Sequence, residues 1–225
     1  MYRAVLLDVY GTLVRDDDDL LTEVCVRVAR VAGGVDSVLV EREWYDRICR
    51  AADESYGAGF RSLNDLNVSS LAETAAHFGA RVDAEVLCAE QMAFWSRPPL
   101  FADAPPFLAA LQVPVCLVSD VDRTDLDALL ALHGITVDAL VSSQDARAYK
   151  PRPEPFRLAL AQLGLDAAEV VHVGDSPSSD VAGAAALGID TAWINRVGRP
   201  LPPRLDPTYV AASLAELLAV LGPGS

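Results

Sequence analysis

The segment LLDVYGTLV, from Leu6 to Val14, combines an apolar run, an aspartate and a Gly-Thr turn. The apolar run starts at Ala4 and has the length of a buried strand, so Asp8 would stand at the strand's carboxyl end. An aspartate in such a place is a candidate nucleophile or metal ligand. Tyr10 follows two residues later, where a second carboxylate would be the natural partner. The segment therefore predicts the first strand of a sheet with a chemically active carboxyl group at its end.

Outward from this segment, short apolar runs alternate with helix-like patterns. The further runs are Val113–Val118, Ala139–Val141, Val170–Val173, Thr191–Ile194 and Tyr209–Val210. Helical patterns accompany them at Leu126–His133, Pro153–Leu163, Ser179–Leu187 and Ser213–Leu221. Such alternation indicates βαβ units and a parallel sheet, and continuous apolar strands fit a sheet that is covered on both faces. We therefore expect an α/β fold with a doubly wound, Rossmann-like parallel sheet.

The alternation is interrupted once, after the first strand. From about Arg15 to Ser96 the sequence shows only helical patterns, at Leu20–Val31, Val38–Tyr56, Ser69–Phe78 and Asp83–Phe94. Four prolines, at positions 98, 99, 105 and 106, mark the end of this segment. We predict an α/β core of residues 1–14 and 97–225 and an all-helical cap of residues 15–96. The acidic run Asp16–Asp19 is interpreted as the solvated start of the first cap helix, because carboxylates favour that turn.

Composition and charge limit the classes of function. A net charge of −14 argues against a nucleic-acid partner and against binding to an anionic membrane. No apolar run reaches the length of a membrane span, and the N-terminus lacks a signal-peptide pattern. The four cysteines lack the spacing of a disulfide framework or zinc site and are expected to be reduced thiols. We therefore expect a cytoplasmic protein with a small-molecule substrate; exposed cap surfaces would allow a homodimer, which the sequence leaves open.

Polar side chains follow the ends of the predicted strands. Asp8 follows the first strand, Ser119 the second and Lys150 the third, while Asp175 and Asp180 follow the fourth. Lys150 is the only lysine among eighteen basic residues, and a guanidinium group cannot imitate its compact ammonium. Ligands of doubly wound sheets bind beyond the carboxyl ends of the strands. The side chains should therefore converge on one crevice, where Asp8 could attack phosphorus and carry a covalent phosphoryl group.

A hard cation is expected in this crevice, because carboxylates near an anionic substrate would otherwise repel it. Magnesium ions bind carboxylates together with substrate phosphate. The expected ligands are Asp8 and Asp175, with the backbone carbonyl of Tyr10 close enough to add another. Ser119 and Lys150 would hold the phosphoryl oxygens and offset the charge that develops during transfer.

Four motifs together resemble those of the haloacid dehalogenase-like hydrolase superfamily. They are DVYGT at residues 8–12, VSD at 118–120, KPRPEPF at 150–156 and HVGDSPSSD at 172–180. The helical segment also lies where the type-1 cap of that family lies. The resemblance implies that Asp8 is the nucleophile and that Lys150 binds phosphate and steadies Asp8.

The same resemblance assigns the other candidate residues. Thr12 and Ser119 would bind phosphate, the first from the turn after the nucleophile and the second from the end of a strand. Asp175 would be a metal ligand, and Asp180 would bind the metal directly or through another group.

Tyr10 departs from the pattern of most phosphatases in this family. They carry an aspartate at this position, which protonates the leaving group and then activates water. Such acid–base catalysis contributes about 10²–10⁴-fold, and tyrosine, with a pKa of about 10, is a poor base at neutral pH. The 2-haloacid dehalogenases of the family have a DxYGT motif, a halide leaving group that needs no proton, and no metal. Tyr10 alone therefore favours a dehalogenase.

The later motifs favour a phosphatase. The dehalogenase pattern resembles SSN where this chain has GDS at residues 174–176, and it places a tyrosine where this chain has Phe156. A metal-free site has no use for the additional carboxylate of Asp175. A dehalogenase also needs a cap arginine for the substrate carboxylate or halide. The candidates are Arg42, Arg47, Arg50 and Arg61.

We therefore expect a Mg²⁺-dependent phosphomonoester hydrolase that acts on a small phosphorylated metabolite through an aspartyl-phosphate. Tyr10 would donate the proton, or a group of the substrate or cap would replace it. Two alternatives stay open. One is a metal-independent 2-haloacid dehalogenase with an ester intermediate on Asp8. The other is a catalytically weak pseudo-enzyme that binds a phosphorylated metabolite or partner.

Overall fold

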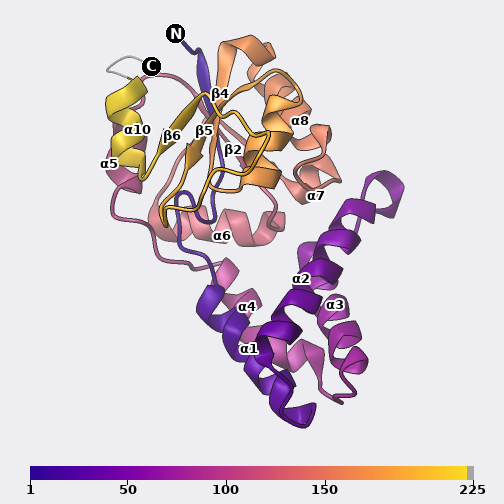
Figure 1. Cartoon of the computed structure of the whole chain (residues 1–225). Coiled ribbons are helices and arrows are strands. Elements are labelled where there is room, and N and C mark those ends of the chain that lie inside the picture. Colours follow the sequence, from indigo (N-terminus) through magenta and orange to yellow (C-terminus); the bar gives the residue numbers. More distant parts are fainter. Residues whose placement is uncertain (222–225) are drawn as a thin grey trace.

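Six parallel strands form the centre of the computed structural model, which describes residues 1–221 (Figure 1). They are β1 (Ala4–Leu7), β2 (Val115–Ser119), β3 (Ala139–Ser142), β4 (Val170–Gly174), β5 (Asp190–Ile194) and β6 (Tyr209–Ala211). Their order in the sheet is β3-β2-β1-β4-β5-β6, and every neighbouring pair is parallel. The predicted doubly wound sheet is confirmed. Residues 222–225, which the predicted core includes, lie outside the described residues.

The strand order places the end of β1 at the middle of the sheet. Strand β1 pairs with β2 on one side and with β4 on the other, so that Leu7 lies beside both Leu117 and Val173. The chain proceeds outward through β2 and β3 on one side and through β4, β5 and β6 on the other. The carboxyl end of β1 is thus the point where the strand order reverses, and such a point is where this class of sheet binds ligands.

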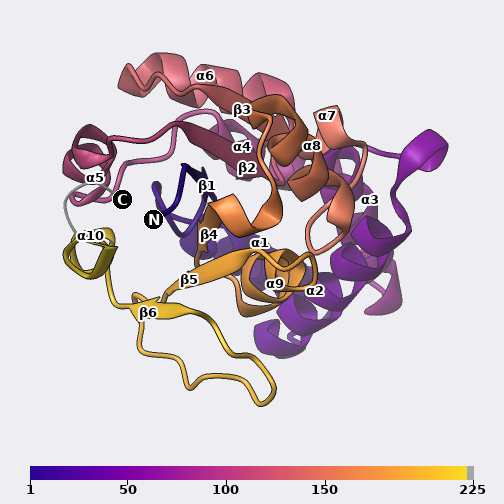
Figure 2. The same cartoon turned by 90° about the horizontal axis from the view of Figure 1, so that it is seen from above.

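Helices cover both faces of the sheet (Figure 2). On one face lie α5 (Ala104–Ala110), α6 (Arg123–His133) and α10 (Leu214–Leu221), and on the other lie α8 (Pro153–Leu163) and α9 (Gly183–Ala185). Side chains alternate between the faces along each strand. Leu7 of β1 packs with Phe107 and Leu126 on the first face, whereas Leu6 packs with Phe156 on the second. Both faces are therefore buried, as the continuous apolar runs predict.

Four helices between β1 and α5 form a separate group beyond the carboxyl ends of the strands (Figure 1). They are α1 (Asp18–Val31), α2 (Ser37–Glu54), α3 (Leu63–His77) and α4 (Ala84–Trp95), with a 3₁₀ turn, η1 (Gly57–Gly59), between α2 and α3. We call this group the helical insert. It has an apolar cluster of its own, which includes Val28, Trp44 and Leu71. The boundaries that the sequence predicts for a cap domain, residues 15–96, stay a prediction.

The two connections between the sheet and the helical insert lie side by side. Val14 and Leu100 form an isolated antiparallel bridge. The amide of Phe101 donates to the carbonyl of Leu13 at 2.9 Å, and the amide of Arg15 donates to a carbonyl of the returning chain at 3.0 Å. We call residues 9–13 the nucleophile turn, after the role that the sequence predicts for Asp8. The chain that follows this turn is paired with the returning chain before the first insert helix begins.

Three local predictions differ from the structure. Helix α3 begins at Leu63 rather than at Ser69, because the hydroxyl of Ser62 caps it by accepting from a backbone amide at 3.1 Å. Helix α5, which the sequence does not predict, contains Pro105 and Pro106, two of the four prolines that mark the end of the helical segment; they lie in its first turn, where a missing N–H is tolerated. The helix predicted at Ser179–Leu187 is a π-helical turn, η3 (Pro177–Ala182), followed by the short α9.

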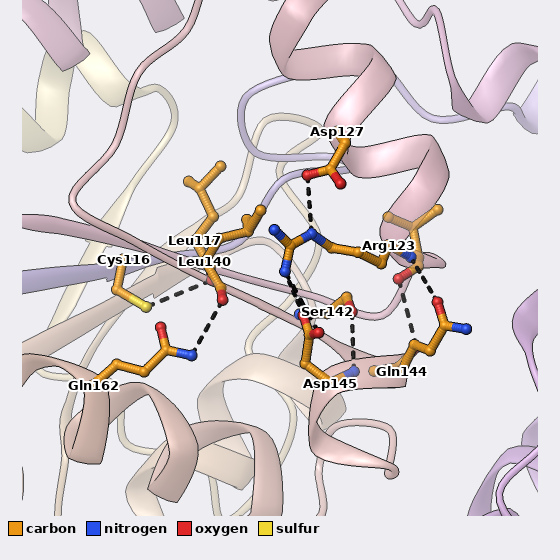
Figure 3. A network of polar contacts seen from close by, with 11 residues as sticks. Cys116, Leu117, Arg123, Asp127, Leu140, Ser142, Gln144, Asp145 and Gln162 are labelled. Atoms are coloured by element: carbon orange, nitrogen blue, oxygen red, sulfur yellow. Dashed lines mark hydrogen bonds and ion pairs between the residues drawn. The ribbon is translucent and has the colours of Figure 1, made fainter.

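A polar network fixes the segment that leads to Lys150 (Figure 3). Arg123 donates to Asp127 at 2.9 Å and to Asp145 at 3.2 Å, and so ties α6 to the short α7 (Ser143–Ala146). Ser142 and Asp145 exchange hydrogen bonds that close α7 as a capping box. The turn after β3 is therefore held in place where the chain runs on toward Lys150.

Two further observations concern membranes and thiols. Within residues 1–221, no helix combines the length and the apolar character that a membrane crossing requires. The four cysteines are free thiols, of which Cys25, Cys88 and Cys116 are buried and Cys49 is exposed.

Candidate active site

Three carboxylates and one ammonium group meet beyond the ends of β1 and β4. The Nζ atom of Lys150 donates to Asp8 Oδ1 at 2.6 Å and to Asp180 Oδ1 at 2.7 Å. Carboxylate oxygens of Asp8, Asp175 and Asp180 lie within 4.8 Å of one another. Asp8, Lys150 and Asp180 are buried. The structure thus brings together four residues that the sequence predicts for one crevice, although they come from segments far apart in the chain.

Burial and mutual attraction set the charges of this group. Burial alone would lower the pKa of Lys150, but the carboxylates of Asp180 and Asp8 outweigh it and raise the pKa well above its usual range. Burial alone would raise the pKa of Asp180, but Lys150 holds it below the ordinary carboxyl value. Burial raises the pKa of Asp8 well above its ordinary value; Lys150 opposes this shift, and Asp180 and Asp175 add to it. Lys150 is therefore a permanent cation shared by two carboxylates.

Asp175 lies directly against the nucleophile turn. Gly11 has a φ of +76°, and an added Cβ there would lie 2.5 Å from Asp175 Cγ, so the close approach requires glycine. Burial, with the charge of Asp180 next in size, raises the pKa of Asp175 to about 6, and Arg199 opposes the rise. The Arg199 Nη2 group donates to Asp175 Oδ2 at 3.2 Å. Asp175 is thus held beside Gly11 by close backbone contact and by one exposed arginine.

His172 supports Asp180 from inside the sheet. Its Nε2 lies 2.9 Å from Asp180 Oδ1, and its ring packs edge-on against Phe156 at 5.1 Å. Burial lowers the pKa of His172, so the neutral imidazole donates this hydrogen bond. The amide of Ser176 donates to Asp180 Oδ2 at 3.0 Å. His172 is therefore a packed and hydrogen-bonded residue that orients Asp180.

The two candidate phosphate-binding hydroxyls differ in position. Ser119 is buried at the end of β2 and lines the cavity that contains Asp8. Thr12 is buried in the nucleophile turn, does not line that cavity, and its Oγ1 has no hydrogen-bond partner within residues 1–221. The structure therefore brings Ser119, and not Thr12, to the wall of the cavity.

Asp120 and Asp122 do more than start helix α6. Asp120 Oδ1 accepts the backbone amide of Lys150 at 2.9 Å, and its burial raises the pKa of Asp120 to about 6. The carboxylate of Asp122 accepts the amides of Leu63 and Asn64 at 3.0 and 3.1 Å, at the first turn of α3. The partners of both carboxylates therefore belong to segments that are distant in the sequence.

Tyr10 connects the nucleophile turn to the helical insert. Its side chain is half-buried, and its hydroxyl donates to the backbone carbonyl of Trp95 at the end of α4. The indole Nε1 of Trp95 in turn donates to Asp17 Oδ2 at 2.8 Å. Burial raises the pKa of Tyr10 further above its usual value. The role of the Tyr10 carbonyl as a metal ligand stays a prediction.

A cavity of about 310 Å³ lies between the ends of the strands and the helical insert. The insert contributes an apolar wall that includes Leu21, Trp44, Ile48 and Leu63. Among the described residues that line this cavity, Lys150 is the only basic one. The cavity therefore combines carboxylates at its base with an apolar wall.

The four arginines predicted as candidates for substrate binding do not line this cavity. Arg47, Arg50 and Arg61 line a separate depression beside α2 and η1, together with acidic residues of the insert. Arg42 is exposed and lines neither. None of the four candidate arginines of the helical insert therefore lines the cavity that contains Asp8.

Two residues of the acidic run belong to the cavity. Asp18 and Asp19 occupy the first turn of α1, as predicted, but Asp16 and Asp17 precede the helix and line the cavity. Burial raises the pKa of Asp17, whose carboxylate accepts from the Trp95 indole. Asp17 is the N-cap residue of α1 and Asp16 is exposed, so the interpretation as a helix start is incomplete only in leaving out that both residues line the cavity. Nothing in a run of four identical residues separates the two groups.

The model of the haloacid dehalogenase-like hydrolase family matches residues 2–188. The chain belongs to the haloacid dehalogenase-like hydrolases. A structure of L-2-haloacid dehalogenase from Xanthobacter autotrophicus aligns with 98% of both chains, with a TM-score of 0.76 and 24% identity. That likeness concerns the fold, which this hydrolase shares over its whole described length.

Curated relatives of this hydrolase catalyse different reactions. Phosphoserine phosphatase from Thermus thermophilus is 32% identical over 128 residues, which cover 54% of this chain and 51% of that protein. (S)-2-haloacid dehalogenase from Pseudomonas sp. is 30% identical over 130 residues, which cover 56% of this chain and 55% of that protein. This hydrolase therefore spans about half the length of these relatives, and both of the expected reaction classes occur among them.

Proposed function

We propose that this hydrolase is a Mg²⁺-dependent phosphomonoesterase that carries the phosphoryl group on Asp8. The observation that carries this proposal is the carboxylate of Asp175, whose oxygens lie within 4.8 Å of those of Asp8 and Asp180. Carboxylate oxygens are the ligands that Mg²⁺ prefers, so the donor set fits this ion. Three carboxylates against one ammonium group, that of Lys150, also leave a negative charge that a divalent cation would offset.

In the proposed reaction, Asp8 attacks phosphorus while the ester oxygen departs. Lys150 and Ser119 hold the phosphoryl oxygens, and Asp175 and Asp180 hold the ion. Bound Mg²⁺ would supply positive charge to the phosphoryl oxygens in the transition state. Water then attacks the phosphorus of the aspartyl-phosphate, the bond to Asp8 breaks, and inorganic phosphate leaves.

The dehalogenase alternative rests on Tyr10 and finds less support in the cavity. A 2-haloacid carries a carboxylate, which needs a positive partner. Lys150 is the only basic residue of the described lining, and its ammonium already contacts two carboxylates. Asp16, Asp17 and Glu41 line the same cavity and would repel an anionic substrate that brings no metal.

The size of the cavity supports a small substrate. A volume of about 310 Å³ is at the lower end of the range for small-molecule sites. The proposed substrate is a small phosphorylated metabolite whose ester group lies against the apolar wall of the helical insert. The cytoplasmic location, the homodimer and the absence of nucleic-acid and membrane partners remain predictions from the sequence.

Metal removal tests the proposal. We expect the protein to release phosphate from p-nitrophenyl phosphate in the presence of Mg²⁺. This release should stop in EDTA and resume when excess Mg²⁺ is added. Release of chloride from 2-chloropropionate, measured in parallel, should stay at the background level. Metal-independent chloride release would favour the dehalogenase instead. Binding of Mg²⁺ and phosphate without turnover would favour the pseudo-enzyme.

A further inference from the structure

The proposed reaction needs a proton donor, and Tyr10 is poorly placed to act as one. An alkoxide is a poor leaving group unless it is protonated as it departs. Tyr10 has one hydroxyl proton, and this proton is donated to the carbonyl of Trp95. A neutral phenol held in this way has no free proton for the substrate and is too weak a base to activate water afterwards.

Most other carboxylates of the cavity also have partners. Asp8 and Asp180 bind the ammonium group of Lys150 at 2.6 and 2.7 Å. Asp120 accepts the backbone amide of the same lysine at 2.9 Å. Asp17 accepts the indole N–H at the end of α4 at 2.8 Å. None of these four groups is free to exchange a proton without losing a contact that shapes the site.

Asp16 is different in position and in contacts. It lines the cavity together with Asp8, and its carboxyl group has no hydrogen-bond partner within residues 1–221. It follows the bridge between Val14 and Leu100 and precedes α1, so it is attached to the core beside the nucleophile turn. The residue as a whole is exposed and can therefore meet a substrate that enters the cavity.

The surroundings of Asp16 suit a group that gains and loses a proton. Partial burial of the carboxyl group is the largest cause that raises the pKa of Asp16, to about 7. The charges of Asp175, Asp18 and Asp17 add to this rise, and Arg199 opposes it. The other titratable residues that line the cavity are Asp8, Tyr10, Asp17, Glu41, Tyr45, Asp120, Lys150, Asp175 and Asp180.

We propose that Asp16 is the general acid and base of this site, in the role that Tyr10 does not fill. The assignment rests on the proposed phosphomonoesterase function. As Asp8 forms its bond to phosphorus, the bond from phosphorus to the ester oxygen breaks and that oxygen takes the proton of Asp16. The resulting Asp16 carboxylate then accepts a proton from the water that attacks the aspartyl-phosphate. Inorganic phosphate leaves, and Asp16 is again protonated.

The test compares Asp16→Asn with Asp18→Asn on two substrates in saturating Mg²⁺. Both substitutions replace a carboxyl group of the same run by an amide, but Asp18 lies in the first turn of α1 and does not line the cavity. For an alkyl phosphate, Asp16→Asn should lower kcat/KM by about 10²–10⁴-fold, the usual contribution of acid–base catalysis. Asp18→Asn should match the wild type.

The second substrate separates proton transfer from a structural effect. Nitrophenolate leaves without a proton, so Asp16→Asn should still form the aspartyl-phosphate from p-nitrophenyl phosphate. The second step, attack of water on the aspartyl-phosphate, would then proceed without the Asp16 carboxylate as general base. We therefore expect a burst of one nitrophenolate per active site, followed by slow turnover, and no such burst in the wild type.

Three outcomes would count against the assignment in different ways. Wild-type kinetics in Asp16→Asn would show that the residue takes no part. Equal losses on both substrates without a burst would show that it acts on the structure and not on the proton. If the wild-type protein hydrolyses neither ester, the proposed function itself fails, and the role of Asp16 falls with it.

Discussion

Replacement of Asp8 by asparagine should abolish phosphate-ester hydrolysis and leave the fold intact. An amide cannot attack phosphorus to form an aspartyl-phosphate, and loss of a nucleophile typically lowers kcat by about 10⁴-fold or more. The measurement is phosphate release at saturating substrate and Mg²⁺, with thermal unfolding recorded on the same sample. Substantial phosphate release by Asp8→Asn would contradict the assignment of the nucleophile.

The fold should survive this substitution for an electrostatic reason. Asp8 is buried, and burial raises its pKa, which means that its charge is expensive to hold in place. The neutral amide removes that charge, while Lys150 keeps Asp180 as its partner at 2.7 Å. A matched control is Asp127→Asn, which breaks an exposed ion pair with Arg123. Such a pair contributes at most about 1 kcal/mol, so the control should keep full activity.

Replacement of Lys150 by methionine should impair both catalysis and stability. The ammonium group is almost fully enclosed and contacts Asp8 and Asp180. Its removal would leave two buried carboxylates without a cation, and breaking a buried pair in this way typically costs about 3–5 kcal/mol. Loss of a group that stabilises transition-state charge lowers kcat by about 10²–10³-fold. Urea unfolding in EDTA at neutral pH and phosphate release in Mg²⁺ measure the two effects.

The loss of stability caused by Lys150→Met should depend on pH. Burial alone would raise the pKa of Asp180, but Lys150 holds it below the ordinary carboxyl value. The stabilising contribution of the pair is therefore complete above the ordinary pKa of about 4 and is lost as the pH falls further. The difference in unfolding free energy between the wild type and Lys150→Met should narrow in acid.

Arg152→Met provides the control for Lys150→Met. Arg152 lies two residues away and forms a partly exposed ion pair with Glu154 at 2.8 Å. Loss of such a pair should change the unfolding free energy by less than about 1 kcal/mol. Equal stability of Lys150→Met and the control at neutral pH would show that the buried carboxylates do not depend on Lys150.

The sheet is predictable from the sequence because its strands are buried on both faces. Runs such as Ala4–Leu7 are apolar throughout, and a helical pattern follows most of the later runs. The elements that the sequence misses have local causes. Helix α5 holds its prolines in the first turn, and the turn η3 places the carboxylate of Asp180 against Lys150 and His172. Helical periodicity in the sequence indicates neither that prolines can occupy a first turn nor that a π-helical turn forms around Asp180.

The candidate site is predictable where topology alone places a residue. Strand order brings Asp8, Ser119 and Asp175 to neighbouring strand ends, and this placement does not depend on how the helical insert packs. The placement of Asp16 and the contact of Tyr10 depend on how the helical insert packs on the core. Such contacts join residues that are far apart in the chain, and a short sequence motif cannot predict them.

The central claim is that the group transferred to Asp8 is a phosphoryl group. The most direct test is to mix the enzyme with p-nitrophenyl phosphate and Mg²⁺, quench in acid within one turnover, and analyse the Asp8 peptide by mass spectrometry. A parallel sample receives 2-chloropropionate in EDTA. We predict a transient phosphoryl group on Asp8 in the first sample and an unmodified peptide in the second. An ester of the haloacid carbon on Asp8, with no phosphoryl group in the first sample, would contradict the account.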